Sequence, residues 1–136
     1  MVALEQSCPR EYEVTQGVEV RISPRRSFSP DVLVVTDEAA QRVARHFAPH
    51  EVVLAVEIVS PTSQSMDRIT KPALYARAGI PYYWRIETDG GITIHTNKID
   101  PAHNVYEPVG TFKNVIETSE PWLITIPFRA LTPRHL

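Results

Sequence analysis

The chain has 136 residues, a formal net charge of -2 and 43% hydrophobic residues. These values are typical of one globular domain with its own core, and they exclude a disordered or fibrous chain. The charge argues against a protein that coats nucleic acid through bulk positive charge. It does not exclude an enzyme that acts on nucleic acid, because an acidic metal site would offset basic patches in the count.

Membrane and secretion signals are missing from the sequence. No apolar run approaches the roughly 20 residues that a spanning helix needs, and the N-terminus lacks the basic and hydrophobic regions of a signal peptide. The single cysteine, Cys8, has no second cysteine for an internal disulfide. We therefore expect a cytoplasmic protein without a membrane partner.

The first half of the chain predicts two short strands or one bent strand over 11–22, a polar loop over 23–30, a strand over 31–35 and a helix over 38–47. Thr36 or Asp37 can cap the helix, and Pro49 ends it. Arginines cluster locally, and we interpret both clusters as solvated basic faces: Arg21, Arg25 and Arg26, and then Arg42 and Arg45.

The second half predicts a strand over 52–59, a loop over 60–65, a helix that ends at Ala78–Gly79 and a strand over 81–87. The Asp-Gly-Gly sequence at 89–91 predicts a hairpin turn. Further short strands are expected over 91–96, 105–109, 111–117 and 122–128. This order favours an α/β or α+β fold, with helices around one mixed sheet.

Glu57 is the residue that most needs an explanation. It is the one polar residue in the run Val52–Val59. A run that is apolar on both faces indicates a central strand covered on each side, so Glu57 is predicted to be buried. Burying an ionised carboxylate without a partner is very costly, so a metal ion, a cationic side chain or a proton must lie beside it.

Asp31 is the carboxylate that can share a site with Glu57. Each starts or lies within an apolar strand, and the chain between them is long enough for a crossover to a neighbouring strand. If the two strands pair, both carboxylates can reach one pocket. Oxygen ligands of this kind suit Mg²⁺ or Mn²⁺.

Three sequence blocks in this order resemble the Uma2 family, also called DUF820, a branch of the PD-(D/E)XK nuclease superfamily: SPDVLVV, LAVEIVSP and DRITKPALYARAGIPYYWRIE. The resemblance covers about Glu11 to Leu131. It implies a restriction-endonuclease-like mixed sheet flanked by helices, and metal-dependent phosphodiester hydrolysis with DNA as the substrate.

The resemblance also implies roles for individual residues. Asp31 matches the acidic residue of the PD element, and Glu57 matches that of the (D/E)XK element, with the backbone carbonyl of Ile58 as a further metal ligand. The motif lysine would fall on Val59, so the resemblance assigns its role to Lys71. A lysine there would orient or help to deprotonate the attacking water and stabilise charge on the phosphate.

Two further residues support this set. Asp67 begins the segment Asp67-x-x-x-Lys71, and Tyr75 can line the same pocket or serve as a core aromatic residue. Pro72 restricts the backbone at Lys71. The helix therefore either starts near Thr70, with Lys71 in its first turn, or starts near Asp67 and bends.

Each assignment has a structural alternative. Glu57 can be a buried carboxylate that is ion-paired with Arg68 or Lys71. Asp31 can simply begin a strand after a proline. Asp67 and Lys71, which are four residues apart, can form an ordinary surface ion pair worth about 0.2–0.5 kcal/mol.

We interpret residues 1–136 as a single Uma2-like nuclease domain that lacks the family's N-terminal helical portion, a wall that a partner in a homodimer can supply. The favoured function is a Mg²⁺- or Mn²⁺-dependent DNA endonuclease. The alternative is a catalytically inactive nuclease-fold module that serves dimerisation or nucleic-acid binding.

Overall fold

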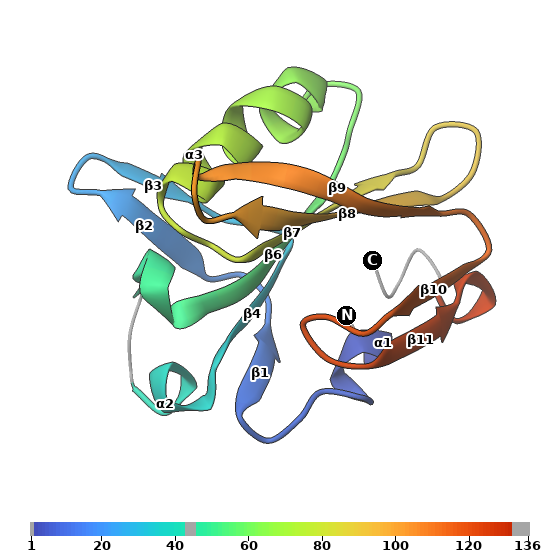
Figure 1. The fold of residues 1–136 in the computed structure, drawn as a ribbon, viewed down its shortest axis with the longest axis horizontal. Coiled ribbons are helices and arrows are strands. Elements are labelled where there is room, and N and C mark those ends of the chain that lie inside the picture. Colours follow the sequence, from blue (N-terminus) through green and yellow to red (C-terminus); the bar gives the residue numbers. More distant parts are fainter. Residues whose placement is uncertain (1, 43–45, 132–136) are drawn as a thin grey trace.

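A mixed six-stranded sheet forms the centre of the fold, in the order β1-β4-β6-β7-β8-β9 (Figure 1). The computed structural model describes residues 2–42 and 46–131. The strands of this sheet are β1 (Tyr12–Thr15), β4 (Val32–Thr36), β6 (Val52–Ile58), β7 (Tyr82–Glu87), β8 (Thr93–Asp100) and β9 (Val105–Phe112). β6 and β7 are parallel, and the other neighbouring pairs are antiparallel. The expected mixed sheet is therefore confirmed.

Two smaller sheets and several short helices complete the described part of the chain. One sheet has the order β3-β2-β5, and the other pairs β10 with β11. Their strands are β2 (Glu19–Ser23), β3 (Arg26–Phe28), β5 (His46–Phe47), β10 (Val115–Thr118) and β11 (Ile124–Pro127). The α-helices are α1 (Val2–Glu5), α2 (Asp37–Ala40) and α3 (Lys71–Arg77), with 3-10 turns η1 (Pro49–Glu51) and η3 (Phe128–Ala130) and a π turn η2 (Met66–Thr70). None of the helices in these residues has the length and apolar character required to cross a membrane.

The large sheet is covered on both faces. Figure 1 shows α3 above it and α1 with β10 and β11 below it to the right. Leu54 and Val56 of β6 belong to the cluster that includes Trp84 and Ile124, whereas Ala55 belongs to the cluster that includes Tyr75. The prediction that β6 is a central strand with two covered faces is confirmed, and this burial takes Glu57 out of water.

The predicted helix over 38–47 is wrong in its extent. α2 ends at Ala40, and β5 replaces the end of the predicted helix; positions 43–45 lie outside the described residues. Thr36 does cap α2, since its Oγ1 accepts a hydrogen bond from the Ala39 N–H at 3.3 Å. The local pattern favoured a helix, but Phe47 instead pairs with Val20 of β2 and is buried there.

The predicted loop over 23–30 and the strands on either side of residue 110 also differ from the structure. β3 pairs with β2 to form a hairpin, and β1 pairs with β4, so residues 11–22 contribute to two different sheets. β9 continues through Gly110 to Phe112, and β10 begins only at Val115. In both cases pairing with the preceding strand, β2 for β3 and β8 for β9, determined where the strand lies.

Candidate active site

The candidate site lies where β4, β6 and β7 meet on the face covered by α3. The antiparallel register of β4 with β6 pairs Val32 with Val56. Asp31, the residue before Val32, therefore lies opposite Glu57, the residue after Val56. The parallel register of β6 with β7 pairs Glu57 with Arg85. The two carboxylates that were selected from sequence therefore occupy neighbouring positions on adjacent strands, as the strand-pairing argument required.

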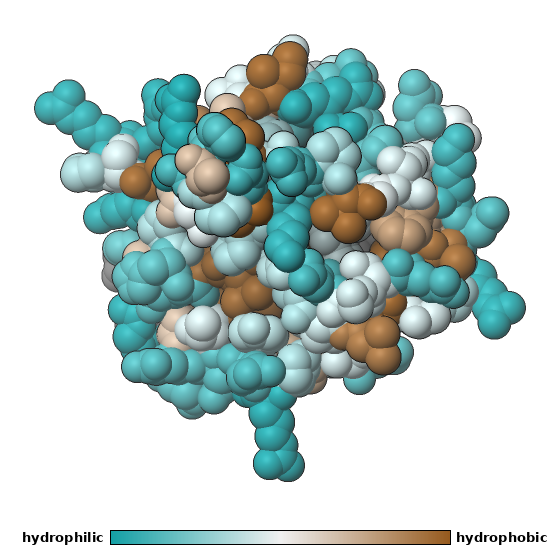
Figure 2. Space-filling model, in the orientation of Figure 1, coloured by the Kyte–Doolittle hydropathy of each residue, from teal (hydrophilic) through white to brown (hydrophobic). Residues whose placement is uncertain are grey.

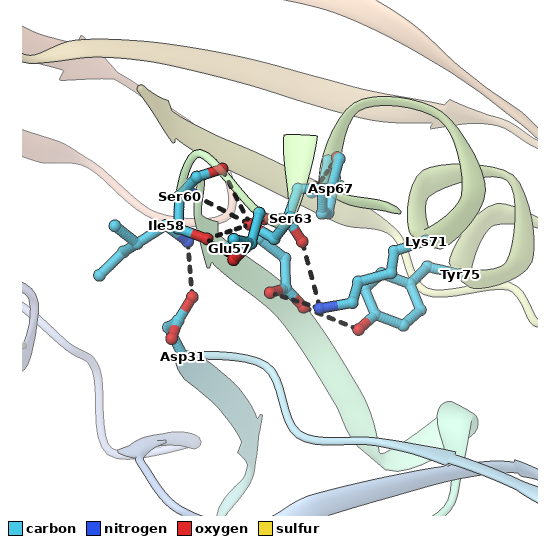
Figure 3. Close-up of polar contacts among 10 residues, drawn as sticks. Asp31, Glu57, Ile58, Ser60, Ser63, Asp67, Lys71 and Tyr75 are labelled. Carbon is cyan, nitrogen blue, oxygen red and sulfur yellow. Dashed lines mark hydrogen bonds and ion pairs between the residues drawn. The ribbon is translucent and has the colours of Figure 1, made fainter. Parts of the chain in front are cut away.

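Glu57 is buried and has two side-chain partners from α3 (Figure 3). Its Oε1 accepts a hydrogen bond from the Tyr75 hydroxyl at 2.8 Å, and its Oε2 lies 3.1 Å from the Lys71 Nζ. Arg68, the other partner considered, binds Glu87 instead, with Nε and Nη2 at 2.7 and 2.8 Å from the two carboxylate oxygens. The cationic partner of Glu57 in this structure is therefore Lys71.

Lys71 bridges two buried carboxylates. Its Nζ also lies 3.1 Å from Asp67 Oδ1, and Asp67 is only 1% exposed. The ion pair of Asp67 with Lys71 is thus an interior contact, and the alternative of an ordinary surface pair is wrong. Ser63 donates a hydrogen bond from its hydroxyl to Asp67 Oδ2, and the Tyr83 hydroxyl donates to the Asp67 carbonyl.

A π turn sets the position of Lys71. The backbone N–H of Lys71 bonds to the carbonyl of Met66, five residues earlier, at the end of η2. Pro72 explains the widened turn, because a proline has no N–H for the carbonyl of Arg68 and its ring would clash with that carbonyl in a regular α-helix. Of the two predicted arrangements, the structure has the longer helix, with the irregularity immediately before Lys71.

Asp31 lies at the entrance to β4 and is exposed. Its Oδ2 accepts a hydrogen bond from the Ile58 backbone N–H at 2.6 Å. Figure 3 shows the Asp31 carboxylate directed at the Ile58 amide, and the Glu57 carboxylate directed at Lys71 and Tyr75. The structure thus brings Asp31, Glu57, Ile58, Lys71 and Tyr75 into one neighbourhood and turns the two carboxylates to different partners.

Sequence reasoning did not select Ser63, Tyr83 or Arg85 as site residues. Ser63 precedes Asp67 by four residues, and this spacing on a helical turn is the signal that predicts such a contact. Tyr83 and Arg85 lie two residues apart on β7 and reach the site from a strand distant in sequence, Tyr83 through its hydroxyl bond to Asp67 and Arg85 by pairing with Glu57. Val59, at the position of the motif lysine, is buried, and its N–H donates to the Ile86 carbonyl at 2.8 Å.

Burial dominates the electrostatics of the site. Loss of water raises the pKa of the Glu57 carboxyl from 4.5 to about 7, although Lys71 and Tyr75 act in the opposite direction. Burial also lowers the pKa of the Lys71 ammonium, but Glu57 and Asp67 outweigh it and leave that pKa above its ordinary value. The pKa of the Tyr75 hydroxyl is raised, first by burial and then by Glu57. With a pKa of about 7, both the protonated and the ionised form of Glu57 are populated at neutral pH.

This pKa predicts a specific pH dependence of stability for the metal-free protein. A carboxyl whose pKa is higher in the folded state stabilises the fold below pH 4.5, and this contribution disappears as the pH rises to about 7. Relative to Glu57→Gln, the wild type is expected to lose about 1.4 kcal/mol per pH unit across this range. Urea unfolding of both proteins between these pH values measures the difference. If the wild type instead gained stability relative to Glu57→Gln as the pH rises, the ion pair of Glu57 with Lys71 would outweigh the cost of burying the carboxylate.

The donor set fits a hard divalent cation. Within residues 2–42 and 46–131, no three histidine, cysteine, aspartate or glutamate side chains form a group that can hold a metal ion. Mg²⁺, however, is typically held by only one or two carboxylates, with waters and substrate phosphates as its other ligands. Asp31 and Glu57 with the Ile58 carbonyl supply oxygen ligands of this kind. They fit Mg²⁺ or Mn²⁺ better than a metal that prefers nitrogen or sulfur.

Comparison with known proteins gives a consistent result. A crystal structure of a putative nuclease belonging to DUF820 from Anabaena variabilis matches with a TM-score of 0.65 and 19% sequence identity, over 99% of this chain and 74% of that chain. No curated protein matches the sequence. The family model for Uma2, described as putative restriction endonuclease, matches residues 2–123. The fold is therefore that of the nuclease-like neighbour, and the chain belongs to the Uma2 family.

Proposed function

We propose that this chain is a Mg²⁺- or Mn²⁺-dependent endonuclease that hydrolyses phosphodiester bonds in DNA. The observation that supports it is the position of Glu57, a buried carboxylate opposite Asp31 and 3.1 Å from the Lys71 ammonium. A divalent cation on Asp31 and Glu57 would polarise the phosphate and offset the charge that develops on it. Membership of a family described as putative restriction endonuclease supports the same reaction class.

The residues around Glu57 each have a defined role in this proposal. Lys71, with 17% of its side chain exposed, can reach both Glu57 and an incoming phosphate, where its charge orients the attacking water and stabilises the transition state. Asp67 holds the Lys71 ammonium as a second carboxylate, 3.1 Å from it. Tyr75 fixes the rotamer of Glu57 through its hydroxyl. The proposal also includes a cytoplasmic location and a homodimer.

The second candidate is a catalytically inactive module that serves dimerisation or nucleic-acid binding. The observation that favours it is that both oxygens of Glu57 already have partners, Tyr75 and Lys71, within the fold. In that case Glu57, Lys71 and Asp67 form a structural ion network, and a cation has no role there.

Calorimetry with Mn²⁺ separates these two functions. The wild type is expected to bind Mn²⁺ at up to millimolar concentrations, and Glu57→Gln is expected to lose that binding, because a neutral amide is a far weaker ligand for a hard cation. Asp31→Asn should weaken binding as well. Wild-type protein that gives no binding heat at millimolar Mn²⁺ would sink the nuclease proposal and leave the inactive module.

A further inference from the structure

The β2–β3 hairpin concentrates positive charge that the rest of the fold does not neutralise. Residues 19–28 contain three arginines and one acidic residue, Glu19, in a chain whose formal net charge is -2. Arg21, Arg25 and Arg26 are all exposed. Figure 2 shows hydrophilic side chains projecting at the left of the molecule, where Figure 1 places this hairpin.

These three arginines differ from Arg68 and Arg85 at the site, and from Arg42. Arg42, Arg68 and Arg85 each have a carboxylate within 4.0 Å. In the part of the chain that the structure describes, no carboxylate lies within that distance of the three hairpin arginines. Their guanidinium groups are therefore available to an anionic partner, and a guanidinium fork matches phosphate oxygens well.

The hairpin is also tied directly to the candidate site. Phe28 of β3 packs edge-on against Tyr75, with ring centroids 5.7 Å apart, and the Tyr75 hydroxyl binds Glu57. Three residues after Phe28 the chain reaches Asp31. Val20 and Phe28 face the core, which leaves Arg21 on the solvent side of the hairpin, and Arg25 and Arg26 lie exposed at its turn.

The length of the hairpin determines how far from the site it can reach. Arg25, at the tip, is six residues before Asp31. At about 3.3 Å per residue of extended strand, its backbone lies at most about 20 Å from Asp31. This upper limit corresponds to about six steps along one strand of duplex DNA, at about 3.4 Å per step. A duplex whose scissile phosphate lies at Asp31 and Glu57 can therefore place flanking phosphates at the hairpin tip.

We propose that the β2–β3 hairpin is a DNA-backbone clamp, in which Arg21, Arg25 and Arg26 bind phosphates about half a helical turn from the phosphate that is cleaved. The inference rests on the proposed function for its substrate and adds the surface that holds this substrate. Contacts of this kind position the duplex without reading its sequence. They make binding strongly dependent on salt.

The test is metal-free binding of a fluorescent DNA duplex, measured by anisotropy over a series of NaCl concentrations. Each lost phosphate contact lowers the slope of log affinity against log salt by about one, so Arg25→Ser/Arg26→Ser should lower the slope by about two and weaken binding at low salt. Lys113→Ser/Arg129→Ser removes the same charge from exposed positions outside the hairpin and should keep the wild-type slope. Arg25→Lys/Arg26→Lys keeps the positive charge and should therefore keep most of the wild-type slope.

Several outcomes would overturn the clamp. Equal slopes for the hairpin and control variants would do so, as would wild-type protein without measurable affinity for the duplex at low salt. If the hairpin-dependent binding were stronger for duplex RNA than for duplex DNA, the partner would be RNA and the proposed DNA clamp would be wrong. Because the assay contains no metal, it fails or succeeds independently of Mn²⁺ calorimetry: a clamp without metal binding sinks only the nuclease proposal, and metal binding without a clamp sinks only this inference.

Discussion

Replacing Lys71 with methionine is expected to lower the free energy of unfolding by about 3–5 kcal/mol at about pH 8.5. The substitution removes the cation that contacts both Glu57 and Asp67, which are 2% and 1% exposed. Methionine fills a similar volume, so the loss reports the missing charge more than a cavity. For a chain of 136 residues the change corresponds to a drop in Tm of roughly 10–17 °C. Urea and thermal unfolding measure it.

Two further variants isolate the cause of this loss. Arg77→Met lies on the same helix, α3, and is exposed, so it should change stability by less than about 0.5 kcal/mol. The double variant Glu57→Gln/Lys71→Met should recover part of the stability lost in the single variant, because one of the two unpaired carboxylates is then neutral. A loss under about 1 kcal/mol for Lys71→Met would show that water or a proton neutralises these carboxylates readily.

Glu57→Gln should reduce Mn²⁺-dependent DNA cleavage by more than about 100-fold, since even residues behind the metal ligands commonly contribute 10–100-fold. The glutamine can keep the fold: its carbonyl can accept from Lys71 while its amide donates to the Tyr75 oxygen. The variant should therefore stay folded at neutral pH, with a stability at or above that of the wild type, in which burial disfavours the ionised Glu57. The rate of conversion of supercoiled plasmid to nicked and linear forms measures the activity.

The matched control for this variant is Glu107→Gln, on the exposed side of β9. It removes the same charge from a different strand and should cleave at the wild-type rate. If Glu57→Gln retained cleavage within about threefold of the wild type, Glu57 would not hold the cation. If it instead lost most of its stability, the Glu57–Lys71 pair would be a structural ion pair whose removal is costly.

The centre of this site was accessible from sequence because its signals are local. Glu57 stands alone in an apolar run, and such a run predicts both its burial and its need for a partner. Lys71 was one of two cations considered as that partner, and the choice between it and Arg68 depended on Glu87, a residue on another strand that binds Arg68. Local pattern alone cannot make this choice.

Other features depend on contacts between distant segments. Asp67 is buried with Ser63 on its Oδ2 and Tyr83, from the next strand, on its backbone carbonyl, while its Oδ1 has the Lys71 ammonium at 3.1 Å. Phe47 is in a strand because β2 offers it a pairing partner 27 residues earlier, at Val20. A helical pattern over 38–47 carries no information about that partner. Strand pairing of this kind overrides local preference.

The π turn at η2 makes the site sensitive to chain length. A π turn holds one residue more than an α-helical turn, and η2 continues directly into α3. Removing one position such as Ile69, whose side chain is 69% exposed, would place the Lys71 N–H four residues after the Met66 carbonyl, as in a regular α-helix. The ring of Pro72 would then meet the carbonyl four residues before it, which is the clash that the π turn avoids. Substitutions at this exposed position do not change the spacing. In this chain the number of residues between Asp67 and Pro72 is therefore constrained by the geometry more tightly than the identity of the exposed residues between them.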